Sequence, residues 1–160
     1  MRKALLLGLA LVAAPLAAKD SLGVFGEWAA FRDPSVPRCY AIAMPRPNRA
    51  AHDYQAFATV GTWPKRAVRG QMHFRLSRKL AQNAAVWLSI GGTRFALTGG
   101  GGDAWAQDKA MDAAIVAGMR SARSMSVTSR DARGRRFSDT YTLEGAATAM
   151  DAASVGCARR

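Results

Sequence analysis

Acidic residues are scarce in this sequence. No aspartate or glutamate lies between Asp53 and Asp103, and Glu27 and Glu144 are the only glutamates. A hydrolase needs a histidine or paired carboxylates that converge in a cleft, and the acidic residues are remote in sequence from His73. His73 falls on the polar face of a predicted strand, so we expect a surface histidine. The sequence therefore predicts no catalytic residue, and a small hydrolase that acts on the cell envelope is the alternative hypothesis.

The sequence also lacks an apolar run long enough to cross a membrane. The run from Ala4 to Ala14 falls far short of the roughly 20 residues that a spanning helix requires. Arg2 and Lys3 precede this run and small residues follow it, which is the pattern of a secretory signal peptide over residues 1–18. We therefore predict an exported protein with a single domain over residues 19–160.

Cysteine is rare, and Cys39 and Cys157 are the only two in the chain. In an oxidising compartment an even number of cysteines favours a disulfide, and only one pairing exists here. Two buried free thiols are the alternative. A zinc site is disfavoured because His52 and His73 show no spacing typical of metal ligands. We predict a Cys39–Cys157 bridge and no bound metal.

No nucleotide-binding motif is present. The four glycines from Gly99 to Gly102 are followed neither by Gly-Lys-Ser/Thr nor by a dinucleotide-binding fingerprint. We interpret them as a flexible loop and predict no cofactor. Asp108 then has the sequence position of an N-cap, and apolar residues at intervals of three and four predict a helix from Lys109 to Ser121.

Alternation of apolar and polar residues predicts strands along most of the remaining chain. The clearest pair is Val86–Ile90 and Phe95–Leu97, joined by Gly91-Gly92 in a tight hairpin turn. A short helix that Gly156 ends is expected at 146–154, and further strands at 24–31, 38–44, 56–61, 71–77, 124–129 and 137–143. This spacing favours a mainly β fold, an antiparallel β-sandwich with one α-helix inserted between strands. The predicted core comprises Trp28, Ile42, Phe57, Phe74, Leu88, Ile90, Phe95, Leu97, Ile115, Met119, Val127, Tyr141 and Leu143.

What the sequence has in excess is positive charge. Lysine and arginine total 23 against 11 acidic residues, so the net charge is +12. Such an imbalance attracts anionic partners over long range. For an exported protein these would be lipopolysaccharide, acidic glycans or another protein, and no nucleic acid is expected. A basic surface that only keeps the protein soluble is the alternative. The candidate anion-binding residues fall into two sequence clusters: Lys65, Arg66, Arg69, Arg75, Arg130, Arg133, Arg135 and Arg136.

Six segments carry a resemblance to a known family: FGEWAAF around Trp28, RCYAIA around Cys39, TWPKRAVRGQ, VWLSIGGTRFAL, DAWAQDKAMDAAIVAGMRSARSMSV, and DTYTLEGAATAMDAASVGC. Their ordered hydrophobic and glycine positions resemble the invasion-associated locus B family of exported bacterial proteins. The resemblance implies an immunoglobulin-like β-sandwich in the periplasm or outer membrane, with no established catalytic residues. Some relatives place a cysteine soon after the first tryptophan, but Ala29, Ala30 and Phe31 follow Trp28 here. This difference weakens the transfer of their disulfide framework and of a role in host-cell invasion.

Overall fold

The computed structural model describes residues 19–158, and the predicted signal peptide lies outside these residues. The fold is mainly β, as predicted, and α1 is the helix inserted between strands. The elements follow one another as β1 (Asp20–Phe25), β2 (Trp28–Asp33), β3 (Arg38–Ala43), β4 (Phe57–Trp63), the 3-10 turn η1 (Pro64–Arg66), β5 (Val68–Arg75), β6 (Val86–Ile90), β7 (Thr93–Gly100), β8 (Asp103–Trp105), α1 (Lys109–Ser121), β9 (Ser124–Arg130), β10 (Arg136–Thr142) and α2 (Ala146–Ala158).

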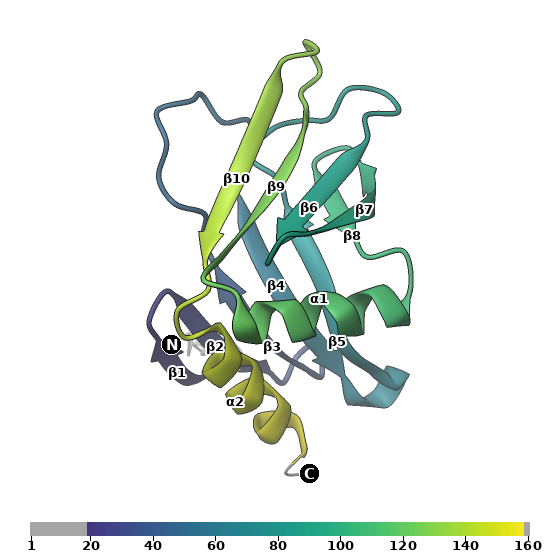
Figure 1. The fold of residues 1–160 in the computed structure, drawn as a ribbon. Helices are drawn as coiled ribbons and strands as arrows, with labels where there is room; N and C mark the ends of the chain where they lie inside the picture. The colour runs from purple at the N-terminus through teal and green to yellow at the C-terminus, as the bar shows by residue number, and fades with distance from the viewer. Residues whose placement is uncertain (1–18, 159–160) are drawn as a thin grey trace, which may run out of the picture.

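The strands form one antiparallel sheet in the order β1-β2-β3-β4-β5-β8-β7-β6-β9-β10. β7 joins the part of the sheet formed by β1–β5 and β8 to the part formed by β6, β9 and β10. Its residues 93–97 pair with β6, and residues 98–100 pair with β8. Figure 1 shows β9 and β10 in front of β3, β4 and β5, so the sheet curves around a core. Across that core the Phe74 ring of β5 lies 5.9 Å from the Tyr141 ring of β10.

Most of the predicted core is buried. Ile42, Phe57 and Phe95 are the exceptions, and each is partly exposed. In β3 the inward positions belong to the small residues Cys39 and Ala41, so Ile42 points to the outer face. The small side chains let α2 pack closely on β3, which a larger inward residue would prevent. The residues confirmed as buried are Trp28, Phe74, Leu88, Ile90, Leu97, Ile115, Met119, Val127, Tyr141 and Leu143.

Both helices pack against the sheet, and a covalent bond fixes the second. The Asp108 carboxylate caps α1 by accepting a hydrogen bond from the Met111 amide at 2.8 Å, as predicted. The predicted Cys39–Cys157 disulfide is confirmed, with the two Cα atoms 5.8 Å apart. The prediction that Gly156 ends the second helix is wrong, because α2 continues to Ala158. A Cβ atom at Gly156 would lie 2.5 Å from the end of the Leu22 side chain, so the glycine lets Leu22 pack closely on α2.

Two further segments differ from the prediction. The single N-terminal strand expected at 24–31 is a hairpin of β1 and β2 that turns at Gly26, whose φ of +57° favours glycine. The loop expected at 99–102 is wrong for Gly99 and Gly100, which belong to β7 and pair with β8, whereas Gly101 and Gly102 form the turn between these strands. A Cβ atom at Gly99 would lie 2.6 Å from the Val86 side chain, so Gly99 allows close contact inside the fold.

Candidate anion-binding surface

The predicted anion-binding cations lie in two separate regions. Lys65 and Arg66 belong to η1 and Arg69 lies near the start of β5, whereas residues 130–136 span the β9–β10 turn. Figure 1 shows these two turns at opposite ends of the molecule. The eight residues of β5 alone extend about 26 Å. The two clusters therefore do not form one continuous surface.

Arg75 lies between the two clusters and is neutralised. Its Nη1 atom lies 2.6 Å from Oδ2 of Asp103, and its guanidinium stacks 3.9 Å above the Tyr54 ring. The second oxygen of the same carboxylate lies 2.9 Å from His73 Nε2. The His73 ring also stacks on Trp105, with the ring centroids 5.2 Å apart. Because Asp103 already balances its charge, Arg75 is a weak candidate for binding an external anion.

Asp131 organises the β9–β10 turn. Its carboxylate accepts hydrogen bonds from the guanidinium groups of Arg78 and Arg135 and from the backbone amides of Arg133 and Arg135. Burial opposes ionisation of Asp131, but these hydrogen bonds outweigh it and lower the pKa of the carboxyl well below its usual range. Arg78 also donates to the carbonyl oxygen of Ala51. Asp131 thus fixes the shape of the turn and neutralises part of its charge.

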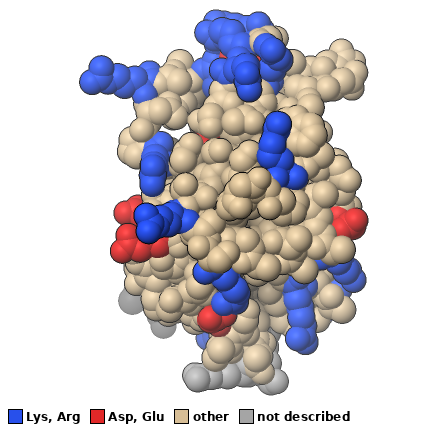
Figure 2. All heavy atoms as spheres, viewed as in Figure 1, with Lys and Arg blue, Asp and Glu red and all other residues tan. Residues whose placement is uncertain are grey.

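Four arginines near this turn keep their charge unbalanced. Arg94, Arg130, Arg133 and Arg136 have no carboxylate oxygen within 4.0 Å among residues 19–158. Arg130 donates to the Gly134 carbonyl oxygen at 2.8 Å. Figure 2 shows lysine and arginine atoms gathered over the β9–β10 turn. We call these four arginines, together with Trp87, the arginine surface.

The strand register creates the centre of the arginine surface. Arg130 of β9 and Arg136 of β10 lie directly opposite each other. On β6 and β7, the Arg94 guanidinium lies 4.6 Å from the centroid of the Trp87 ring. A shallow hollow of about 240 Å³ lies between these groups and carries three arginines and no carboxylate. Its lining residues are Ala85, Trp87, Arg94, Thr128, Ser129, Arg130 and Arg136.

This arrangement of charge works against stability in the absence of an anion. Like charges directly opposite each other on neighbouring strands destabilise a sheet, and Arg130 faces Arg136 in this way. Arginine presents a planar fork of N–H donors that matches carboxylate, sulfate and phosphate oxygens. The Trp87 ring supports the Arg94 guanidinium, and Thr128 beside it offers a hydroxyl group. The surface therefore has the donors and the charge to hold an anionic group.

Part of the arginine surface could be predicted from the sequence. Arg130, Arg133 and Arg136 were predicted from their clustering in the chain. Arg94 and Trp87 were not, because only the pairing of β6 with β9 brings them beside this cluster. The signal available was that Arg94 lies on the polar face of a strand whose hairpin partner carries Trp87.

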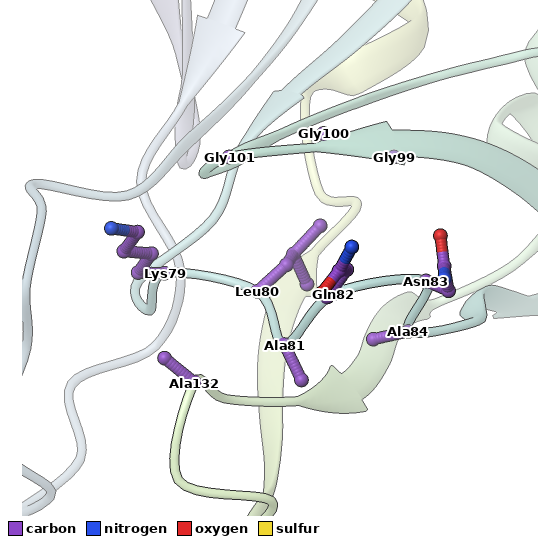
Figure 3. A pocket seen from close by; sticks show the side chains of 10 residues that line it. All are labelled: Lys79, Leu80, Ala81, Gln82, Asn83, Ala84, Gly99, Gly100, Gly101 and Ala132. Carbon is purple, nitrogen blue, oxygen red and sulfur yellow. The ribbon is translucent and has the colours of Figure 1, made fainter.

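A second hollow of about 560 Å³ lies beside the segment that leads into β6 (Figure 3). Figure 3 shows the Leu80 side chain pointing toward the strand that carries Gly99, Gly100 and Gly101. Lys79 is the one charged side chain in its lining, which contains no carboxylate, histidine, serine or cysteine. Because it offers neither a nucleophile nor an acid–base pair, we do not assign a reaction to it.

Comparison of the chain with protein-family models, curated proteins and solved structures gives no match. The likeness to the invasion-associated locus B family therefore stays a prediction. No helix in residues 19–158 has the length and apolar character to span a membrane. The same residues contain no cluster of His, Cys, Asp and Glu that could hold a metal ion.

Proposed function

We propose that this chain is an exported, non-enzymatic protein of the bacterial envelope that binds anionic ligands through the arginine surface. The candidate ligands are lipopolysaccharide and acidic glycans, in the periplasm or at the outer membrane. Membership of the invasion-associated locus B family and an immunoglobulin-like sandwich arrangement of the sheet are part of this proposal. The observation that carries the ligand class is the hollow lined by three arginines and no carboxylate.

Polyanions suit this surface better than small anions do. Arg133 lies at the tip of the turn, while Arg94, Arg130 and Arg136 line the hollow. A ligand with repeated sulfate, phosphate or carboxylate groups contacts several of these cations at once. Each exposed ion contact contributes only about 0.2–1 kcal/mol, so binding depends on their number. Several contacts linked in one ligand raise the overall affinity through the effective concentration of each group.

A small hydrolase is the alternative, and one contact favours it. His73 lies beside Asp103, which resembles the base and orienting carboxylate of a catalytic site. In the described part of the chain, however, the hydrogen bond to Asp103 is the only one that the His73 ring makes. A hydrolase of this type also needs a nucleophile within hydrogen-bond reach of the imidazole. The arrangement therefore supports the binding function more strongly than the enzymatic one.

The test is retention of the protein, residues 19–160, on immobilised heparin and on lipopolysaccharide across a salt series. A variant with Arg94, Arg130, Arg133 and Arg136 changed to Gln loses the arginine surface. Four exposed contacts of about 0.2–1 kcal/mol each predict a loss of affinity between roughly fourfold and several hundredfold. Binding of the unchanged protein should weaken as salt rises, because exposed charges are screened.

The matched control removes four cations elsewhere, by changing Lys19, Lys65, Arg66 and Arg123 to Gln. None of these has an ion-pair partner among residues 19–158. The control variant has the same net charge as the test variant. If binding depends on the arginine surface, the control variant should be retained nearly as strongly as the unchanged protein. Equal loss in both variants would show that only net charge matters and would refute the assigned surface.

A further inference from the structure

A groove lies between α1, α2 and the β4–β5 turn, at the end of the fold away from the β9–β10 turn. Its volume is about 480 Å³, which falls in the range of small-molecule sites. Figure 1 shows α1 and α2 side by side near the β4–β5 turn. The residues that line it are Thr62, Pro64, Ala67, Arg69, Gly70, Lys109, Ala113, Val116, Ser154, Cys157 and Ala158.

Small side chains keep this groove open. Ala113 of α1 and Ala158 of α2 are both exposed, and neither side chain is long enough to fill the space between the helices. Gly70 has a φ of +65°, and a Cβ atom there would approach Val116 to 3.9 Å. The Cys157 disulfide fixes α2 on the sheet, so the wall that α2 provides is held in place. The groove is therefore a feature of the fold rather than of one side-chain conformation.

Two cations lie in this otherwise mostly apolar groove. Arg69 and Lys109 both line it, and no acidic residue does. The acidic residues closest to Lys109 in the chain, Asp108 and Asp112, have other partners. The Asp108 carboxylate caps the helix through the Met111 amide. Asp112 is buried, and its Oδ1 atom accepts a hydrogen bond from the backbone amide of Met72 at 2.8 Å. Neither Arg69 nor Lys109 has an ion pair within residues 19–158.

We propose that this groove binds a small amphipathic carboxylate of the fatty-acid class. Arg69 and Lys109 bind the carboxylate group, because arginine and lysine form charge-assisted hydrogen bonds with it. The alkyl chain lies along the apolar wall formed by Pro64, Ala113 and Val116, where it leaves water. This site is independent of the arginine surface, because the two lie at opposite ends of the fold and share no residue.

The experiment is calorimetric titration of residues 19–160, which contain every described strand and helix, with octanoate, 1-octanol and acetate. Octanoate should bind more tightly than both others, because only octanoate has the charged group and the alkyl chain together. Changing Arg69 and Lys109 to Gln should weaken octanoate binding about tenfold or more. Changing the exposed Ala113 to Trp fills the groove and should abolish binding while circular dichroism stays unchanged.

The matched control is a double variant, Lys65→Gln with Arg66→Gln. Both cations lie in the β4–β5 turn that borders the groove, but neither lines the groove. Their removal should leave octanoate affinity within about twofold. Equal affinity for octanol would exclude a role for the cations, and equal affinity for acetate would exclude a role for the apolar wall. Absence of octanoate binding, or full binding by a folded Ala113→Trp variant, would overturn the proposal. Heparin retention is measured separately, so the two sites fail or succeed independently.

Discussion

Asp139 is completely buried in the core, next to Tyr141 on β10. Its Oδ2 atom accepts a hydrogen bond from the Ser77 amide at 2.8 Å, and its Oδ1 atom has no partner among the described residues. Burial raises the pKa of this carboxyl, and the hydrogen bonds from Ser77 offset only part of that effect. The folded protein therefore holds a proton on Asp139 more tightly than the unfolded chain does.

The first prediction concerns Asp139→Asn. A raised pKa in the folded state contributes stability below the unfolded pKa, and this contribution is lost as pH rises through the folded pKa. Asparagine keeps an acceptor for the Ser77 amide but cannot ionise. The variant should therefore gain stability relative to the unchanged protein as pH rises. Urea unfolding from pH 4 to 8 measures this difference, and a constant difference across that range would contradict it.

The second prediction concerns Asp131→Asn, for which the pH dependence of stability has the opposite sign. The lowered pKa of Asp131 contributes stability above the unfolded pKa, and that stability is lost as pH falls through the folded pKa. The variant leaves the buried Arg78 with Asp53 as its remaining ion-pair partner, at 3.7 Å. It should be less stable than the unchanged protein at neutral pH, and the difference should shrink as pH falls. Urea unfolding measured from neutral pH down to about pH 2 tests this prediction, because the contribution of Asp131 is lost only below the ordinary pKa of an aspartate.

Sequence patterns could place these two aspartates but could not find their partners. Alternation along β10 puts Asp139 on the same face as Tyr141, so its burial follows from the pattern. The Ser77 amide lies 62 positions away in the chain, and Arg78 lies 53 positions from Asp131. Contacts between residues this far apart in the chain depend on the strand order. Local alternation of residues does not specify that order.

The third prediction concerns α2, which the disulfide holds on β3. Cys39 and Cys157 are 118 positions apart, so the bridge closes a long loop in the unfolded chain. On the chain-entropy account, removing the bridge should lower the free energy of unfolding by about 4–5 kcal/mol. Urea unfolding of a double Cys→Ala variant measures the loss. A loss below about 1 kcal/mol would show that packing alone holds α2.

The fourth prediction contrasts two apolar residues on separate strands of the sheet. Leu88 of β6 is fully buried, whereas Ile42 of β3 faces outward. Leu88→Ala should cost about 2–5 kcal/mol because it leaves a cavity in the core. Ile42→Ala should cost clearly less, because its site already opens to solvent. Comparable losses for both variants, measured by urea unfolding, would place Ile42 in the core after all.

Helix α1 and the β6–β7 hairpin could be predicted from local signals. Asp108, the apolar spacing and the Gly91-Gly92 turn act over a few residues and need no long-range information. The face of β3 that points into the core could not be predicted from local signals. Ile42 is more apolar than Ala41, so hydrophobicity alone places Ile42 in the core. What decides it is α2, which needs small residues beneath it. The short strand β8 was missed because three residues carry too little alternation to be recognised.

Across the whole molecule, unbalanced charge separates into distinct regions. The arginine surface lies at the β9–β10 turn, and Lys65 and Arg66 lie at the β4–β5 turn. The sequence predicted the excess of positive charge and part of the residues involved. It could not predict the separation, because the position of a turn in space depends on the complete strand order. Asp103 likewise neutralises Arg75 only because β8 pairs with β5.

The most direct test of the central claim is a residue-resolved titration. Uniformly ¹⁵N-labelled protein is titrated with a short heparin oligosaccharide at low salt, and backbone amide shifts are followed. Binding through the arginine surface predicts the largest shift changes at Trp87, Arg94 and residues 128–136, with reversal on added salt. Changes centred on residues 64–69, or equal changes spread over all basic residues, would contradict the account.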